Sequence, residues 1–193
     1  MKYLKMLGLA AVAAMALMAV TAGAASATTL SVGGVTQSSA VQIGASLAAG
    51  SSAILKDSFG TTTDTCTESS VEGETEGSFS GATVGGKVSG LSFKKCSHTT
   101  TVISNGSLSV AWTSGTNGTV SSAGAEVTVN STAFGASAVC KTGAGTAIGT
   151  ATGVASGNAT IDINGKISCG ILGTATWTGT YTVTSPSGLG VES

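Results

Sequence analysis

Arginine is missing from this chain of 193 residues, and charged residues of all kinds make up only 9% of it. Proline and histidine occur once each, as Pro186 and His98, and aromatic residues amount to 4%. A surface without arginine or a lysine cluster cannot neutralise phosphates, which excludes nucleic acid as a partner. Hydroxyl and amide groups, rather than charges, must keep such a protein in solution.

The N-terminus has the pattern of a secretory signal peptide. Lys2 and Lys5 precede an apolar run of about 15 residues, followed by small residues up to Ala27. We predict a signal peptide over residues 1–27 and a single secreted domain over residues 28–193. A bilayer span needs about 20 residues, so we expect no membrane insertion of the mature chain. We expect the product to be extracellular or at the cell surface, or periplasmic in a Gram-negative host.

The four cysteines are Cys66, Cys96, Cys140 and Cys169. An even number in an exported chain indicates two disulfides, for which three pairings are possible. The first two cysteines are almost as far apart as the last two, so we predict Cys66 with Cys96 and Cys140 with Cys169. Each bond would close a loop of about 30 residues and stabilise the fold by about 3.5 kcal/mol. No two cysteines have the close spacing of zinc ligands, so we expect no metal there.

The rest of the chain has the pattern of short strands without an amphipathic helix. Apolar residues alternate with small or polar ones over residues 107–113 and again over residues 175–185, where Pro186 ends the strand. Many short strands with glycine-containing turns are typical of a sandwich or a barrel. Of these we predict an antiparallel β-sandwich, immunoglobulin-like or jelly-roll-like.

Two Asn-Gly pairs mark expected turns, because both residue types tolerate positive φ. Asn117-Gly118 should follow the strand at residues 107–113, with its antiparallel partner resuming around residues 127–129. For Asn164-Gly165 we predict a three-residue loop over residues 164–166 that sets Ile163 opposite Ile167. A two-residue loop would instead place the apolar residues of one strand opposite the polar residues of the other.

Three features carry a resemblance to known proteins. They are the two spaced cysteine pairs, the Gly-Thr-Asn-Gly-Thr turn at residues 115–119 and the ending Trp-Thr-Gly-Thr-Tyr-Thr-Val-Thr-Ser-Pro at residues 177–186. In these the chain resembles a group of small exported bacterial β-sandwich proteins of no assigned activity. The resemblance implies a bacterial origin and a sandwich fold, and it carries over no functional residue.

His98 would have to take part in any Ser/His/Asp relay, with Asp57, Asp64 or Asp162 as its orienting partner. No serine stands in a nucleophile-elbow pattern, and His98 lies in a polar run typical of a solvated loop. We therefore expect no catalytic residue, no cofactor and no enzymatic activity.

Acidic residues concentrate in one stretch, with Asp64 followed by Glu72, Glu74 and Glu76. On an extended strand the three glutamates share a face, where carboxylate oxygens could bind calcium. The twelve-residue calcium-loop pattern is absent, so a solvated acidic edge ranks above a metal site.

Two classes of function fit these observations. The first is a noncatalytic secreted or cell-surface structural or interaction protein, such as a coat, adhesin-like or filament subunit, which associates with itself or with other surface proteins. The alternative is a secreted module that binds carbohydrate or another small ligand. The threonine row at residues 176–184 could face a sugar, whereas we expect Trp112 and Trp177 in the core.

Overall fold

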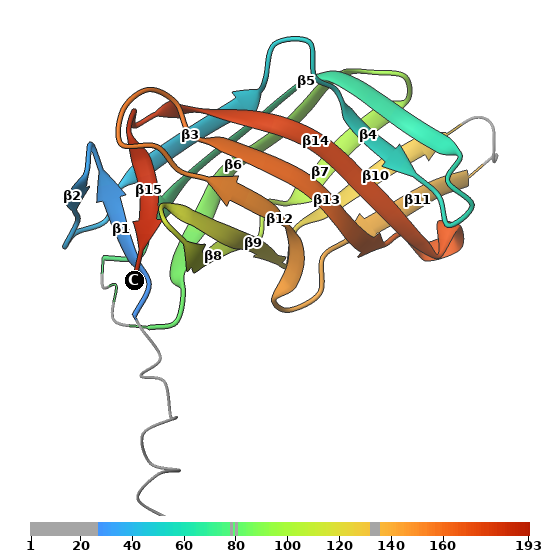
Figure 1. Cartoon of the computed structure of the whole chain (residues 1–193). Helices are drawn as coiled ribbons and strands as arrows, with labels where there is room; N and C mark the ends of the chain where they lie inside the picture. Colours follow the sequence, from blue (N-terminus) through green and yellow to red (C-terminus); the bar gives the residue numbers. More distant parts are fainter. Residues whose placement is uncertain (1–26, 78, 80, 132–135) are drawn as a thin grey trace, which may run out of the picture.

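The computed structural model describes residues 27–77, 79, 81–131 and 136–193 (Figure 1). All but the last residue of the predicted signal peptide lie outside this part of the chain. No helix among the described residues has the length and hydropathy to cross a membrane. The elements are β1 (Thr29–Val32), β2 (Val35–Thr36), β3 (Gln42–Leu47), β4 (Ala53–Lys56), β5 (Thr62–Thr75), β6 (Val84–Cys96), β7 (Thr99–Ser104), β8 (Ser107–Ser114), β9 (Asn117–Ala123), β10 (Glu126–Ser131), β11 (Ala136–Lys141), β12 (Thr146–Thr152), β13 (Thr160–Ser168), the 3₁₀ helix η2 (Gly170–Leu172), β14 (Thr174–Ser185) and β15 (Leu189–Glu192).

The main sheet has 12 strands, all pairings in it are antiparallel, and it closes into an 8-strand barrel. β14 closes it, because this strand pairs with β13 on one side and with β3 and β4 on the other. β3 and β4 in turn both pair with β5. The predicted antiparallel all-β fold is confirmed, but the predicted sandwich is replaced by a barrel. Closure gives the backbone groups of β14 partners on both sides, where two stacked sheets would leave free edges.

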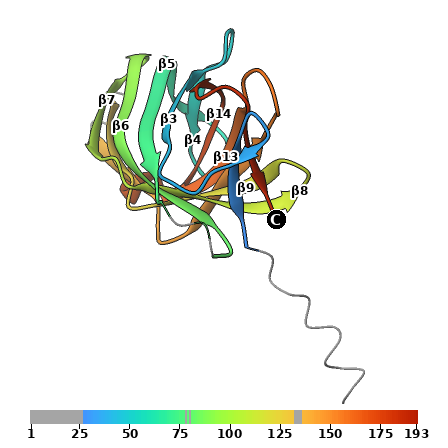
Figure 2. The same ribbon diagram turned by 90° about the vertical axis from the view of Figure 1, so that its left-hand side faces the viewer.

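One part of the barrel wall has no hydrogen-bonded ladder. β6 pairs with β8 only from Val84 to Lys87, while β7 pairs only with β10 and ends the order of the sheet. Figure 2 shows β6 and β7 next to each other in the wall. Side-chain hydrogen bonds, described below, hold the connection between β6 and β7 in place.

A second, 3-stranded sheet of β15, β1 and β2 lies at one end of the barrel (Figure 1). Its apolar residues Leu30 and Val191 are 2% and 5% exposed and pack with Val84 of the barrel. Trp112 N donates to Thr28 Oγ1 at 3.1 Å, which ties the start of the small sheet to β8. The small sheet therefore closes this end of the barrel.

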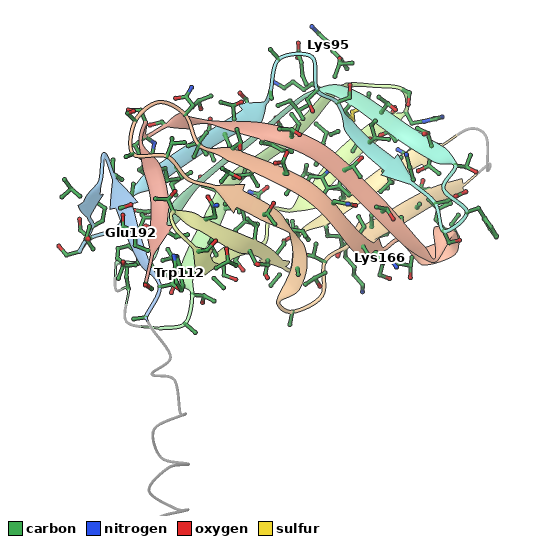
Figure 3. All side chains as sticks on the ribbon, viewed as in Figure 1. Lys95, Trp112, Lys166 and Glu192 are labelled. Atoms are coloured by element: carbon green, nitrogen blue, oxygen red, sulfur yellow. A yellow bond between two sulfur atoms is a disulfide. The ribbon has the colours of Figure 1, made fainter. Side chains whose placement is uncertain are left out.

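The alternation predicted for residues 175–185 is confirmed in β14, where Tyr181 and Val183 are buried and Pro186 follows the strand. Apart from Asp64, which is buried, the charged side chains of the described residues are exposed or partly exposed. Figure 3 shows Lys95 and Lys166 pointing away from the barrel, and both are exposed. The barrel thus has a mainly apolar interior and a polar outer face.

Both predicted Asn-Gly turns are wrong. Asn164 and Gly165 lie inside β13, which pairs with β14 along its whole length, so that Ile163 is opposite Gly179 rather than Ile167. Asn117 begins β9, and the turn after β8 falls two residues earlier, where Gly115 has a φ of 56°. Residues 127–129 belong to β10, which pairs with β11 and β7 instead of β8.

Candidate functional site

The two disulfides join Cys66 to Cys96 and Cys140 to Cys169, which is the sequential pairing predicted from the spacing. Cys66 and Cys96 are directly opposite each other on β5 and β6. The second bond ties β11 to the end of β13. Two disulfides indicate an oxidising environment outside the cytoplasm.

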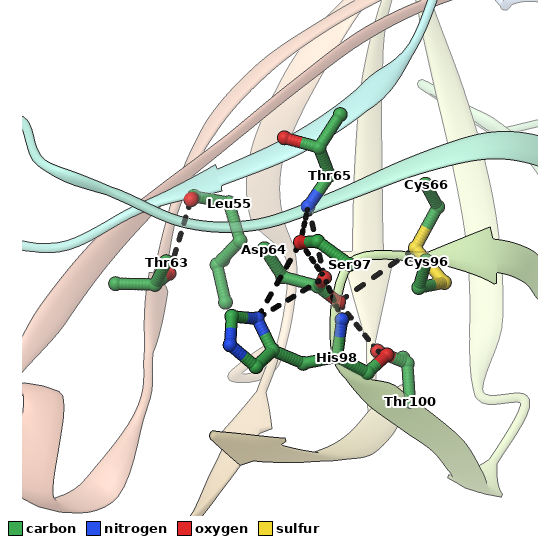
Figure 4. Close-up of polar contacts among 9 residues, drawn as sticks. All are labelled: Leu55, Thr63, Asp64, Thr65, Cys66, Cys96, Ser97, His98 and Thr100. Atoms are coloured by element: carbon green, nitrogen blue, oxygen red, sulfur yellow. Dashed lines mark hydrogen bonds and ion pairs between the residues drawn. A yellow bond between two sulfur atoms is a disulfide. The ribbon is translucent and has the colours of Figure 1, made fainter. Parts of the chain in front are cut away.

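A polar cluster surrounds Asp64, which is 3% exposed (Figure 4). Its carboxylate accepts hydrogen bonds from Ser97 Oγ at 2.8 Å, His98 N at 3.0 Å, Thr100 Oγ1 at 2.5 Å and Thr65 N at 2.9 Å. Three of these donors belong to the connection between β6 and β7 or to the start of β7. Asp64 therefore holds this connection onto β5, where the ladder between β6 and β7 is missing.

The Asp64 cluster does not have the geometry of a catalytic relay. His98 Nδ1 lies 3.4 Å from Ser97 Oγ and 3.8 Å from Asp64 Oδ1, so both neighbours face the same ring nitrogen. In a relay the nucleophile and the carboxylate contact opposite nitrogens. Ser97 Oγ also donates directly to Asp64, which favours a role in holding the turn. Asp57 and Asp162, the other two carboxylates considered from the sequence, bond to Phe59 N, Thr61 N and Thr180 Oγ1 instead.

The acidic residues predicted as calcium candidates are not all brought together. Glu72, Glu74 and Glu76 are exposed, whereas Asp64 is buried toward the interior near the other end of β5. Among the described residues, the group of three possible ligand atoms close enough to share an ion consists of Asp64, Cys66 and Cys96. Both of these sulfur atoms are bonded to each other, so this group lacks the thiolates that a metal would need.

A cavity of about 160 Å³ lies inside the barrel. Apolar side chains from most of the barrel strands line it, including Ala45, Val71, Val120 and Ile163, and Leu30 of the small sheet lies at its end. A barrel of eight strands is wide enough either to be filled by side chains or to hold one small ligand. In this barrel many of the inward side chains are alanine and valine, which leave the space open.

A smaller cavity of about 60 Å³ lies in the half of the barrel that holds the disulfides, with Cys66 and Cys140 in its lining. Trp177 lines both cavities. Its ring meets Phe93 edge-to-face at 5.9 Å and Tyr181 edge-to-face at 6.4 Å. Trp177 is therefore packed among aromatic rings in the interior, as expected, but it also borders both spaces.

Most polar side-chain groups along the larger cavity are bonded within the protein. Tyr181 Oη donates to Ser69 Oγ at 3.0 Å, Thr116 Oγ1 donates to Gly153 O at 2.7 Å, and the Ser122 hydroxyl pairs with another hydroxyl. Burial raises the pKa of Tyr181 to about 12, although the bond to Ser69 acts in the opposite direction. The tyrosine is therefore neutral at physiological pH.

No local pattern in the sequence predicts this cavity, because its lining comes from many strands far apart in the chain. Comparison of the chain with protein-family models, curated proteins and solved structures finds no match. The resemblance to small exported bacterial proteins stays a prediction, and a function has to be inferred from the residues described above.

Proposed function

We propose that this protein is a noncatalytic, exported binding protein that holds a small, uncharged apolar molecule inside its barrel. The observation that carries the proposal is the apolar cavity of about 160 Å³. An apolar cavity of roughly 150 Å³ is large enough to bind benzene. A ligand of this kind belongs to the small-ligand class predicted as the alternative from the sequence.

The cavity is not a requirement of the fold. At roughly 24 cal/mol per Å³, a cavity of 160 Å³ lowers the free energy of unfolding by about 4 kcal/mol compared with a filled interior. Larger side chains at Ala45 or Ala151, which both line the cavity, would fill much of this space. Keeping small residues at such positions makes sense when an occupant supplies the missing contacts.

The chemistry of the lining favours a hydrocarbon-like molecule over a sugar. A sugar carries many hydroxyl groups, and each one buried without a partner is unfavourable by about 1–3 kcal/mol. Tyr181, Thr116 and Ser122 already use their hydroxyls within the protein. The carbohydrate part of the predicted alternative is therefore not retained for this site.

Thermal unfolding of the exported protein with and without benzene tests the proposal. A molecule that binds only the folded state raises the unfolding midpoint with increasing concentration. We expect such a rise for the natural protein and its loss in Ala45→Leu, which fills the cavity. Ala147→Leu is the matched control, because Ala147 is exposed on β12. A midpoint that stays constant in the natural protein, or that rises equally in Ala45→Leu, contradicts the proposal.

The other function predicted from the sequence, a structural or interaction protein of the cell surface, is the second candidate and has one supporting observation. Phe59 and Ile171 are 92% and 66% exposed. They lie in the β4–β5 loop and in η2, at the same end of the barrel, because Lys56 pairs with Thr176 (Figure 1). If this end mediates self-association, the natural protein should form oligomers in sedimentation experiments and Phe59→Ser should be monomeric. A natural protein that is monomeric at high concentration would eliminate this candidate.

A further inference from the structure

The indole N–H of Trp177, a partly buried side chain, has an unusual hydrogen-bonding state. Its Nε1 atom is buried and has no hydrogen-bond partner among the described residues. By contrast, Nε1 of Trp112 donates to Gly115 O at 2.9 Å. A buried donor without a partner is unfavourable, and indole N–H groups in protein interiors usually find one.

The unpaired N–H belongs to Trp177, which borders both cavities together with Leu91 and Ala125. The Trp177 ring contacts Phe93 and Tyr181 edge-to-face. Several other polar groups of the lining, such as the Tyr181 hydroxyl, are already bonded within the protein. Trp177 thus carries an unpaired hydrogen-bond donor on a ring that borders a mainly apolar space.

We propose that the natural ligand has a compact apolar body with one neutral hydrogen-bond acceptor, a carbonyl or ether oxygen, to which Trp177 Nε1–H donates. This inference rests on the proposed function and narrows its ligand class to small ketones, aldehydes, esters or ethers. A carboxylate does not fit, because Lys87, the cationic residue of the lining, is exposed and would leave the buried charge unpaired.

The test compares two ligands of similar size, cyclohexanone and methylcyclohexane, which differ in the acceptor oxygen. Dissociation constants are measured for the natural protein, for Trp177→Phe and for the control Trp112→Phe. The affinity ratio of the ketone to the hydrocarbon should fall about 2- to 12-fold in Trp177→Phe, which is the effect of one hydrogen bond, and should not change in Trp112→Phe.

Nuclear magnetic resonance of the natural protein gives a second readout that needs no variant. The indole proton of Trp177 should shift downfield when cyclohexanone binds, and it should not do so with methylcyclohexane. If both ligands bind but the affinity ratio and this resonance are the same with and without the acceptor, the inference about Trp177 is wrong and the apolar site stands. If neither ligand binds the natural protein, the proposed function itself fails.

Discussion

Replacing Asp64 by alanine removes the acceptor that holds the β6–β7 connection onto β5. The carboxylate is 3% exposed and accepts two bonds from backbone N–H groups, of Thr65 and His98, and two from hydroxyls, of Ser97 and Thr100. The hydroxyls can turn toward water after the substitution, whereas the backbone groups have less freedom. At about 1.5–3 kcal/mol for each bond to a charged group, the two backbone bonds predict a loss of about 3–6 kcal/mol.

The assay is urea unfolding of the protein with its disulfides intact. The bond between Cys66 and Cys96 still ties the end of β6 to β5 in the variant, so we expect a lower unfolding midpoint rather than an unfolded chain. A domain of this size has about 5–15 kcal/mol of stability, which leaves the predicted loss measurable.

Two other aspartates provide matched controls for the same substitution. Asp162 is exposed and accepts a single bond from Thr180, so Asp162→Ala should change stability by no more than about 0.5 kcal/mol. Asp57 accepts hydrogen bonds from two backbone N–H groups in an exposed turn. Asp57→Ala should lower the free energy of unfolding by about 1 kcal/mol. An Asp64→Ala loss no larger than that of Asp162→Ala would refute the role assigned to the Asp64 cluster.

Three further outcomes are expected. Tyr181 is the only tyrosine among the described residues, and because burial raises its pKa from 10.0 to about 12, phenolate absorbance should show it still neutral at pH 11. The folded state favours the neutral phenol. The contribution of Tyr181 to the free energy of unfolding is therefore complete below pH 10 and falls by up to about 3 kcal/mol by pH 12. Tyr181→Phe should not show this fall. Gly165→Ala should destabilise by about 1–3 kcal/mol in urea unfolding, since its Cβ would lie 2.7 Å from Ile148 Cα, whereas Gly77→Ala should have little effect. Hydrogen exchange should be faster in β7 than at residues 160–163 of β13, which pair on both sides, and equal protection would show that β6 and β7 form a ladder.

Local patterns in the sequence predicted those features that depend on neighbouring residues. Alternation over residues 175–185 predicted β14 and its buried face, because side chains of a strand point to opposite sides in turn. The single proline after this strand marks its end correctly. Cysteine spacing predicted the pairing of both disulfides, since each joins cysteines that are consecutive in the chain.

The same reasoning failed at the two Asn-Gly pairs, for a reason that lies in the tertiary structure. A Cβ at Gly118 would lie 2.7 Å from Ala111 O, and one at Gly165 would lie as close to Ile148. Glycine stands at these positions because another strand approaches closely, and not because the chain turns there. A sequence pattern does not distinguish these two uses of glycine.

The sequence by itself determined that the chain is a β-rich protein with two disulfides and few charges, since composition and alternation report on each strand separately. Only the tertiary structure decided that the sheet closes, because closure depends on the pairing of β14 with β3 and β4, more than a hundred residues earlier. Closure also decides the candidate site. The larger cavity forms, and Trp177 borders it, only when strands from the whole chain surround one interior.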